Sequence, residues 1–455
     1  MKNGLSERIE QFYLEVTAAV AAKELNYRYK DIDLLPTAIQ FYLNEFINSF
    51  SFFKEIESIQ NEAEWHRFIA KYVNGFAPKI SLLKRIQLAA SDVLRYVASL
   101  RAGKPQAADY YFFITNNKFL KFTADIKLEL EKQTAKQAAY LIWERKDQSL
   151  VDNALYALPA MAFPAVWTRD YSRFRNYSLL VDRVLGYHLK NQTKKIILVE
   201  GCVLAEHIVA LVSRKLTIPN VCIQWGFFAK TVTQAGWRNM PFDQFLVWGT
   251  FYKKAFSAYN PQLSCLPVGH PTLSFANELV KNKSILFGVQ KVMGDHITEA
   301  DIYRFLDFAI QFAQNHPDFE VIIRSHPDFN IPESYLNNSA NPKNLVWHNY
   351  RAFTLTQSFE KAKYCVSISS TLSTESIAHG CYPLFLRASE TPLQVYDLLA
   401  TSNDFTHVFD FSNFDAGILH LETLDTALYL NELRQQMFTH LGKTAVSTIV
   451  ENIRN

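Results

Sequence analysis

Short apolar runs of strand character alternate with helical patterns of about a dozen residues along most of this chain, and this alternation constrains its fold most strongly. Strands separated by such helices form βαβ units, in which the strands pair in parallel and the helices cover the sheet. The sequence therefore predicts an α/β protein. The predicted strands are residues 110–115, 195–199, 220–224, 244–248, 284–289, 319–323, 345–348, 364–367 and 382–386.

Helical patterns lie between these runs, and one of them has a recognisable beginning. Thr298 is a predicted N-cap, because Glu299 and Asp301 fall in the first turn, where carboxylates stabilise a helix. This helix is expected to end near Gln314. Further helices are predicted over residues 177–190 and 205–215.

At 455 residues the chain is too long for a single core, so several domains are expected. Residues 1–105 show apolar positions at helical spacing and few strand-like runs, which predicts a helical N-terminal region. The two sets of strands predict Rossmann-like domains over residues 106–270 and 271–425, and residues 426–455 are helical again. Two facing Rossmann-like halves with a cleft between them is the simplest architecture for these patterns.

The composition indicates which kinds of partner the protein binds and in which cellular compartment it is found. A formal net charge of +3 gives no sign of the basic stripe of a nucleic-acid-binding protein, so no nucleic-acid partner is expected. Five cysteines without a Cys-x-x-Cys pair predict free thiols in a reducing compartment. The N-terminus lacks a signal-peptide core, and the apolar stretch 154–167 is too short to span a membrane. We expect a cytoplasmic protein, with peripheral contact at the inner face of the membrane left open.

Small hydroxyl residues follow the predicted strand 364–367 and lead into a helix. They are Ser369, Ser370 and Thr371, and Glu375 lies one turn further on. Free N–H groups at a helix N-terminus, together with hydroxyl donors, suit a phosphate group. Glu375 would suit the hydroxyls of a ribose. The alternative is that Ser370 or Thr371 only caps the helix.

The tetrapeptide Arg324-Ser325-His326-Pro327 follows another predicted strand. Parallel strands end at the same edge of a sheet, where ligands of such folds bind. A histidine there can donate to a phosphate oxygen or protonate a leaving phosphate, and Pro327 would fix the turn that holds the ring. Arg324 is a further candidate for the same nucleotide site. The alternatives are a solvated His326 in an ordinary turn and an Arg324 that belongs only to the sheet edge.

The first half also has polar residues at strand ends. Glu200-Gly201 ends one strand, and its carboxylate could serve as a base toward an acceptor hydroxyl or as a nucleophile toward a sugar. His207 could assist it. Gln224 and Trp225 end the next strand and could contact an acceptor sugar. For each of these residues helix capping, solvation or packing is the alternative.

Two other segments bear on the cleft. Residues 268–271, Val-Gly-His-Pro, stand at the junction of the halves and predict a hinge turn, although His270 could instead face the cleft. Gly288 and Gln290 follow the first strand of the second half, in a position often used on the phosphate side of such folds.

In order, these segments resemble GT-B glycosyltransferases of bacterial surface polysaccharide synthesis. The resemblance covers roughly residues 195–387. Within that group an HP motif and an SS/T motif mark the CMP-sugar users, which are sialyltransferases, polysialyltransferases and Kdo transferases. The resemblance implies that His326 and Pro327 form the HP motif, that residues 369–371 form the SS/T motif, and that both bind CMP. An acidic-acidic-Gly motif holds the base in the sialyltransferases, and here Glu200-Gly201 matches it with a valine before it.

These observations predict a metal-independent GT-B glycosyltransferase without a cofactor. It would move a sugar from a nucleotide donor, a CMP-sugar being favoured, to a saccharide or lipid-linked saccharide acceptor in capsule or lipopolysaccharide assembly. Glu200 and His326 would be catalytic. The alternatives that stay open are a CDP-polyol phosphotransferase, a UDP-sugar 2-epimerase of the same fold and a non-catalytic sugar-binding or scaffold protein.

Overall fold

The computed structural model gives the fold of most of the chain. It describes residues 5–25, 27–47, 49–76, 81–84, 86–87, 90, 108–142, 153–154, 177–178, 181, 193–226, 238–275, 281–293, 297–387 and 405–455. The predicted helix 177–190 lies mostly outside these residues.

The first half is built on a seven-stranded sheet with the order β5-β4-β3-β6-β7-β8-β9, and all neighbouring strands are parallel. The order reverses between β3 and β6, as in doubly wound sheets. Helices cover both faces of such a sheet, which is why its strands are apolar without alternation. The strands are β3 Tyr110–Ile114, β4 Ala138–Ile142, β5 Asn153–Ala154, β6 Lys195–Val199, β7 Asn220–Ile223, β8 Gln244–Val247 and β9 Cys265–Pro267.

The second half has a six-stranded parallel sheet with the order β12-β11-β10-β13-β14-β15. This order reverses between β10 and β13, so the two halves repeat one topology. The strands are β10 Ser284–Gly288, β11 Glu320–Arg324, β12 Leu345–His348, β13 Tyr364–Ser367, β14 Tyr382–Leu386 and β15 Val408–Phe409. The predicted strands are confirmed within a residue or two. The strands β4, β5, β9 and β15 were not predicted, and of these β5, β9 and β15 have only two or three residues.

Helices connect the strands in both halves. The predicted cap is confirmed, because the hydroxyl of Thr298 accepts a hydrogen bond from the backbone N–H of Asp301 at 3.2 Å. The first half contains α6 Lys118–Thr134, α8 Leu204–Lys215 and α9 Thr250–Tyr259. The second half contains α10 Glu299–Asn315, α11 Glu333–Leu336, α12 Leu355–Lys361, α13 Thr371–Glu375 with the 3₁₀ turn Ser376–His379, and α14 Phe414–Leu421.

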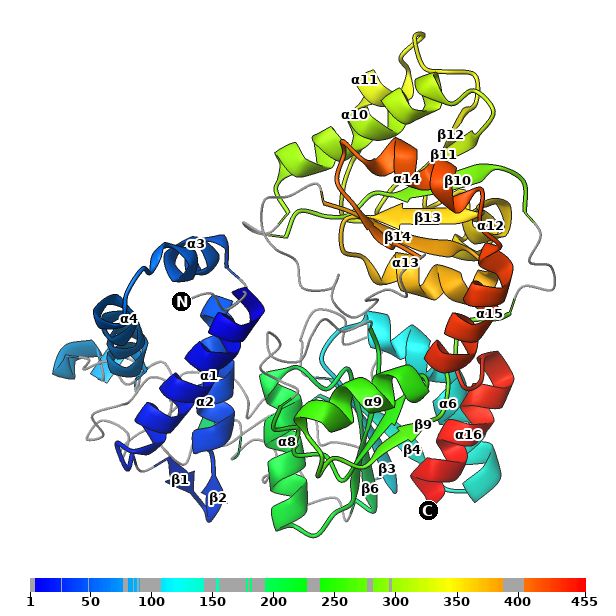
Figure 1. Cartoon of the computed structure of the whole chain (residues 1–455). Coiled ribbons are helices and arrows are strands. Elements are labelled where there is room, and N and C mark those ends of the chain that lie inside the picture. The colour runs from blue at the N-terminus through cyan, green and yellow to red at the C-terminus, as the bar shows by residue number, and fades with distance from the viewer. Residues whose placement is uncertain are drawn as a thin grey trace.

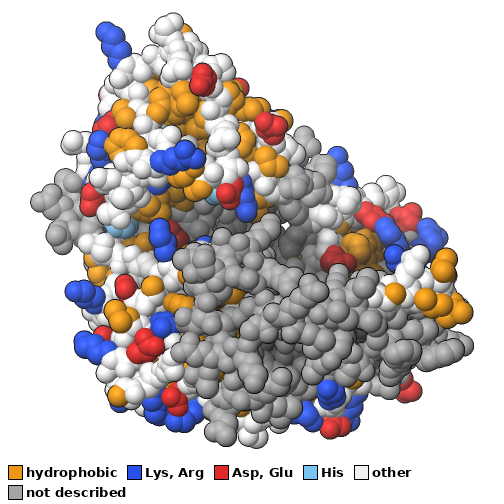
Figure 2. Space-filling view, turned by 180° about the vertical axis from the view of Figure 1, so that it is seen from behind, with side chains coloured by type: hydrophobic (Ala, Val, Ile, Leu, Met, Phe, Trp, Pro, Cys, Tyr) orange, Lys and Arg blue, Asp and Glu red, His pale blue; other side chains and the backbone are white. Residues whose placement is uncertain are grey.

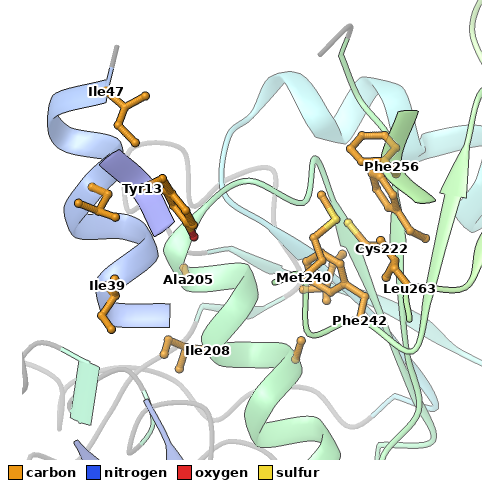
Figure 3. Packing of buried hydrophobic residues seen from close by; sticks show 14 of the residues in the cluster. Tyr13, Ile39, Ile47, Ala205, Ile208, Cys222, Met240, Phe242, Phe256 and Leu263 are labelled. Atoms are coloured by element: carbon orange, nitrogen blue, oxygen red, sulfur yellow. The ribbon is translucent and has the colours of Figure 1, made fainter. Parts of the chain in front are cut away.

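The N-terminal region forms a helical layer against the first half (Figure 1). Its apolar side chains belong to the same core as those of α8, so it is not a separate unit. Figure 3 shows Tyr13 and Ile39 beside Ala205 and Ile208. The elements are α1 Leu5–Ala21, α2 Leu35–Ile47, α3 Phe50–Ser58, α4 Glu62–Gly75 and a hairpin of β1 Arg28–Tyr29 and β2 Ile32–Asp33, which the expectation of an all-helical region had missed.

The C-terminal helices return from the second half to the first (Figure 1). After α15, Thr426–Met437, the chain crosses over and forms α16, Gly442–Arg454, which packs on α6. At the crossing the backbone N–H of His270 donates to the carbonyl of His440 at 2.9 Å, and the N–H of Gly442 donates to the carbonyl of His270 at 3.0 Å. Two segments therefore join the halves side by side.

His270 lies in this junction rather than in the cleft. Its ring is buried against Phe122, Trp248 and Phe438, and burial lowers its pKa to about 3. The ring nitrogen Nδ1 accepts the backbone N–H of Leu273 at 3.3 Å. The segment is thus a turn of the hinge, as one of the two sequence interpretations expected.

The two sheets face each other across their carboxyl edges. A Cβ placed on Gly226, after β7, would lie 3.6 Å from Cγ2 of Thr371, the first residue of α13. Burial raises the pKa of Tyr252 of α9, and the charge of Glu375 of α13, which lies nearby, raises it further. Two facing Rossmann-like domains with a helical N-terminal region are therefore confirmed as the architecture.

The surface shows no dominant charge on the part of the molecule that Figure 2 describes. Lys and Arg side chains are interspersed with Asp and Glu, and hydrophobic side chains gather on one face of the second half. Within the described residues, no helix is long and apolar enough to cross a bilayer.

Candidate functional site

The hydroxyl cluster lies where the order of the second sheet reverses. Ser369 follows β13, and its backbone N–H donates to Oε1 of Gln290, which follows β10, at 2.6 Å. The amide of Gln290 also donates to Oγ of Ser369 at 3.3 Å. Ligands of doubly wound proteins bind in the crevice at this point, between strands that run to opposite sides. Gln290 thus ties together the two loops that border the crevice.

Helix α13 packs closely on the end of β10. A Cβ at Gly288 would lie 2.8 Å from Cδ2 of Leu372, so glycine lets the helix approach. Ser370 caps α13, because its hydroxyl accepts the N–H of Leu372 at 3.2 Å. Ser369, Ser370 and Thr371 are all half-buried. Capping therefore accounts for the hydroxyl of Ser370, while the cluster as a whole still borders the crevice.

His326 stands on the other side of β10, in the loop after β11. Its Nδ1 accepts the backbone N–H of Asp328 at 3.0 Å, so the neutral ring carries its proton on Nε2 and can donate there. Burial lowers the pKa of His326, the charge of Asp328 raises it, and the charge of Lys291 lowers it. Pro327 is exposed in the turn between His326 and Asp328.

The order β11-β10-β13 separates His326 from the hydroxyl cluster by one strand. At roughly 4.8 Å between strands, the two loop ends lie about 10 Å apart, with the loop of Gln290 and Lys291 between them. Both sides are accessible, since His326 and Ser369 are half-buried. The two motifs therefore border one crevice without touching. Lys291 is a charged residue of this crevice that the sequence analysis did not identify.

A cavity of about 130 Å³ opens beside His326. Its lining is mainly aromatic and apolar, with a few polar groups, as is common for small-molecule sites. A cavity of about 150 Å³ in another protein holds benzene, so this one has room for a single six-membered ring. Its lining includes Ile323, Ser325, Phe329, Trp347, Asn349 and Tyr350.

The side chain of Arg324 is bonded within the fold. It is buried, and Nη1 donates to the carbonyl of Phe353 at 3.0 Å and to Oγ of Ser358 at 2.9 Å. The guanidinium therefore holds the segment between β12 and α12. The sheet-edge interpretation explains it better.

Glu375 is the last residue of α13, one turn beyond the hydroxyl cluster. It is half-buried in α13 and faces Tyr252 of the first half. Burial raises its pKa to about 7. A contact between Glu375 and a ribose stays a prediction. The structure shows that Glu375 lies at the interface of the two halves.

In the first half, Glu200 stands where the order of that sheet reverses, between β3 and β6. Its Oε1 lies 3.9 Å from Nζ of Lys118, the first residue of α6 after β3. Burial raises the pKa of Glu200, and the charge of Lys118 lowers it. The carboxylate is thus partly withdrawn from solvent and next to a cation.

Two residues expected to touch an acceptor are used inside the fold. Gln224 is buried, where its Nε2 donates to the carbonyl of Gly226 at 2.9 Å and its Oε1 accepts the N–H of Trp248 at 2.9 Å. His207 is buried on α8, with Nε2 3.1 Å from the carbonyl oxygen of Gly201. We therefore leave both out of the proposed site.

Trp225 has a mixed position. Its ring packs edge-on against Phe119 and Phe122, with centroid distances of 5.1 and 4.8 Å. It remains half-buried, and Nζ of Lys118 lies 5.1 Å from its centroid. Packing is established for Trp225, and its contact with an acceptor stays a prediction.

No known family model and no curated protein matches this sequence. Solved structures do match. The glycotransferase of kitacinnamycin is 12% identical, with a TM-score of 0.51, over 77% of this chain and 100% of its own. UDP-GlcNAc 2-epimerase from Neisseria meningitidis, solved with UDP-GlcNAc bound, is also 12% identical, with a TM-score of 0.50, over 76% of this chain and 100% of its own.

Identity at this level shows a common fold and nothing narrower. Two Rossmann-like domains with facing carboxyl edges, and a last helix that returns to the first domain, define the GT-B fold in this chain. The neighbours of that fold include both glycosyltransferases and UDP-GlcNAc 2-epimerases. Among the described residues no group of three or more His, Cys, Asp or Glu side chains is placed to hold a metal.

Proposed function

We propose that this protein is a glycosyltransferase that uses a pyrimidine nucleotide sugar, with a CMP-sugar as the favoured donor. One observation carries the proposal. The ring-sized cavity, His326, and the bridged loops of Gln290 and Ser369 follow one another along the carboxyl edge of the second sheet. This arrangement offers the base a cavity at one end and offers the phosphate donors from His326 and the bridged loops further along the edge.

The donor would bind to the second half in an extended form. The base would enter the cavity between Phe329 and Trp347, and the phosphate would reach the hydroxyls of residues 369–371. The Nε2–H of His326 would donate to a phosphate oxygen, and Lys291 would add positive charge. Because these groups supply donors and charge, the reaction would need no metal ion.

The acceptor would bind against the first half. In the reaction, an acceptor hydroxyl gives its proton to Glu200, and its oxygen bonds to the anomeric carbon of the donor sugar. The bond from that carbon to the phosphate oxygen breaks, and the nucleotide leaves with the electron pair. Closure of the halves over the two substrates would keep water out and so limit hydrolysis of the donor. The acceptor would be a saccharide or a lipid-linked saccharide of capsule or lipopolysaccharide, and the protein would act in the cytoplasm or at the inner face of the membrane.

Nucleotide binding tests the donor assignment directly. Thermal-shift measurements with CMP, CDP, UDP and GDP should show the largest stabilisation with a cytidine nucleotide. A ligand at about 100 times its Kd adds roughly 2.7 kcal/mol. The effect should be lost in His326→Ala and kept in His66→Ala, which changes an exposed histidine of α4. A preference for UDP would overturn the cytidine assignment, and no shift with any nucleotide would overturn the site.

A UDP-sugar 2-epimerase is the second candidate, because a UDP-GlcNAc 2-epimerase is among the structural neighbours. The two activities differ in their need for an acceptor. Incubation with UDP-GlcNAc alone would give the 2-epimer only if the protein is an epimerase. Consumption of CDP-glycerol would instead indicate a polyol-phosphate transferase. We expect neither, and consumption of a CMP-sugar with an acceptor present.

A further inference from the structure

Lys118 and Glu200 meet at the point where the order of the first sheet reverses. Lys118 begins α6 directly after β3, and Glu200 follows β6, the strand that pairs with β3. Helices after strands on the two sides of this point run to opposite faces of the sheet, so a crevice opens there. The second half holds its proposed nucleotide site at the equivalent point. The pair thus lies in the matching crevice of the other half.

Aromatic rings hold the ammonium group of Lys118 in this crevice. Its Nζ lies 4.9 Å from the centroid of Phe119 and 5.1 Å from that of Trp225, within the range of cation–π attraction. The same nitrogen is 3.9 Å from Oε1 of Glu200. A lysine on an open surface would move freely among rotamers, whereas this one has three neighbours that favour a single place.

The backbone around Glu200 is held in an unusual conformation. Glu200 has a φ of +96° and Gly201 a φ of +90°, and a left-handed conformation is costly for a residue with a side chain. The turn is fixed by Glu206, whose buried carboxylate oxygen Oε2 accepts the N–H of Gly201 at 2.8 Å. The N–H of Glu200 itself donates to the carbonyl of Ile223 at 2.9 Å. Strain of this kind persists where the surrounding structure fixes it, and it often marks functional sites.

The charges around Glu200 come from several elements. Cys202 and Glu206 lie on its own turn and on α8, Cys222 lies on β7, and Lys118 lies on α6. Burial raises the pKa of Cys202, Cys222 and Glu206 well above their usual values. Burial also raises the pKa of Glu200, and Lys118 opposes that effect.

We infer that Lys118 is a positioning residue of the proposed transfer reaction, whose ammonium group holds the Glu200 side chain as a carboxylate ready to take the proton of the acceptor hydroxyl. The inference rests on the proposed function in one respect, the role of Glu200 as the base. Lys118 itself neither gains nor loses a proton in the step. It acts by stabilising the negative charge that Glu200 must carry before the acceptor is deprotonated.

The test replaces Lys118 with methionine, which keeps the length of the side chain and its contact with the rings but removes the charge. The titration of the Glu200 carboxyl is followed by ¹³C NMR in the unliganded full-length protein, with Glu200→Gln used for assignment. For charges about 4 Å apart in a water-like surrounding, the loss should raise the titration midpoint by about 0.5 to 1 pH unit. The acidic limb of kcat/KM against pH should move upward by the same amount.

Two further variants serve as controls. Lys121→Met removes a charge from an exposed lysine one turn along the same helix and should leave both the titration and the pH profile unchanged. Lys118→Arg keeps the charge and should restore both. Because Lys118→Met and Lys118→Arg are compared by far-UV circular dichroism and melting temperature, a folding defect would be recognised.

The outcomes separate the inference from the proposed function. An unchanged titration of Glu200 in Lys118→Met overturns the inference, whatever the activity. A titration that moves while the acidic limb of the activity stays in place shows that Glu200 is not the base, and this overturns the link to catalysis. A moved titration in a protein that consumes no nucleotide sugar overturns the proposed function and leaves the electrostatic role of Lys118 standing.

Discussion

His326 illustrates how a single side chain can serve its turn and a ligand with different atoms. Its Nδ1 accepts the N–H of Asp328, which holds the ring in the loop, and this leaves the N–H at Nε2 as a donor. A buried histidine of the same chain, His270, also accepts through Nδ1 but is enclosed by aromatic rings. The bonding pattern is similar, and exposure alone makes His326 the candidate for binding.

Replacing His326 with asparagine separates these two roles. The Oδ1 of asparagine can accept the N–H of Asp328, as in an Asx turn, but nothing takes the place of Nε2. Since a hydrogen bond to a charged group is worth about 1.5–3 kcal/mol, we expect nucleotide affinity to fall about 10- to 150-fold. Isothermal titration calorimetry measures this loss, and chemical unfolding should show little change in stability. Unchanged affinity in His326→Asn would exclude the ring from the nucleotide site.

For helix α13, the sequence predicts where the helix begins but not what surrounds its last residue. Its start was predictable, because serine and threonine after a buried strand are typical of a helix N-terminus. The surroundings of its C-terminal end could not be predicted, because the position of Glu375 beside Tyr252 depends on how the first half packs against the second. The sequence shows spacing along one helix, whereas the partner of Glu375 lies more than a hundred residues away.

The burial of Glu375 in α13 makes the stability of the protein depend on pH. The pKa of Glu375 is about 7 in the folded protein, against 4.5 for an unperturbed glutamate. Between these values the unfolded chain loses the proton while the folded protein keeps it, so this contribution to stability is full below pH 4.5 and is lost as the pH rises toward 7. Glu375→Gln cannot ionise and should therefore gain stability relative to wild type between pH 5 and pH 8.

Melting temperatures of both proteins at a series of pH values measure this difference. Glu432→Gln, which changes an exposed carboxylate on α15, is the control. A constant difference between Glu375→Gln and wild type across the range would mean that Glu375 ionises normally in the folded protein.

The strands could be predicted more fully than the site. Runs such as residues 364–367 and 382–386 are apolar on both faces, so length and composition identify them without tertiary information. Gln224 and Arg324 also stand at strand ends, yet their polar groups bond within the protein. Position at the carboxyl edge is therefore readable from sequence, whereas the direction in which a side chain points depends on neighbours that are distant in the chain.

The junction of the halves depends on close backbone contact. A Cβ on Gly269 would lie 2.1 Å from the carbonyl oxygen of His440, and the φ of Gly269 is +98°. A side chain at this position would clash with the backbone of His440, and it would also be strained by the positive φ. The two crossing segments can therefore approach only because glycine stands at this position.

Gly269→Ala should accordingly destabilise the protein by about 2 kcal/mol or more, since it combines backbone strain with a clash against main-chain atoms. Gly442→Ala is the matched comparison in the opposite segment. There φ is +55° and the nearest atom to a Cβ is the carbonyl oxygen of Leu273 at 3.3 Å, so a loss of about 1–2 kcal/mol from strain is expected. Urea unfolding measures both. Equal effects would show that the crossing relaxes to admit a methyl group.

The return of α16 has a consequence for biosynthesis. Its buried residues Val446, Ile449 and Ile453 complete the core beneath β3 and α6, although more than three hundred residues separate them from Tyr110. During translation the sheet of residues 110–267 emerges first, but one side stays uncovered until this segment leaves the ribosome. In a nascent chain the core of the second domain would thus be complete before that of the first. A premature stop near codon 440 would therefore destabilise the first domain, although that domain is synthesised earlier.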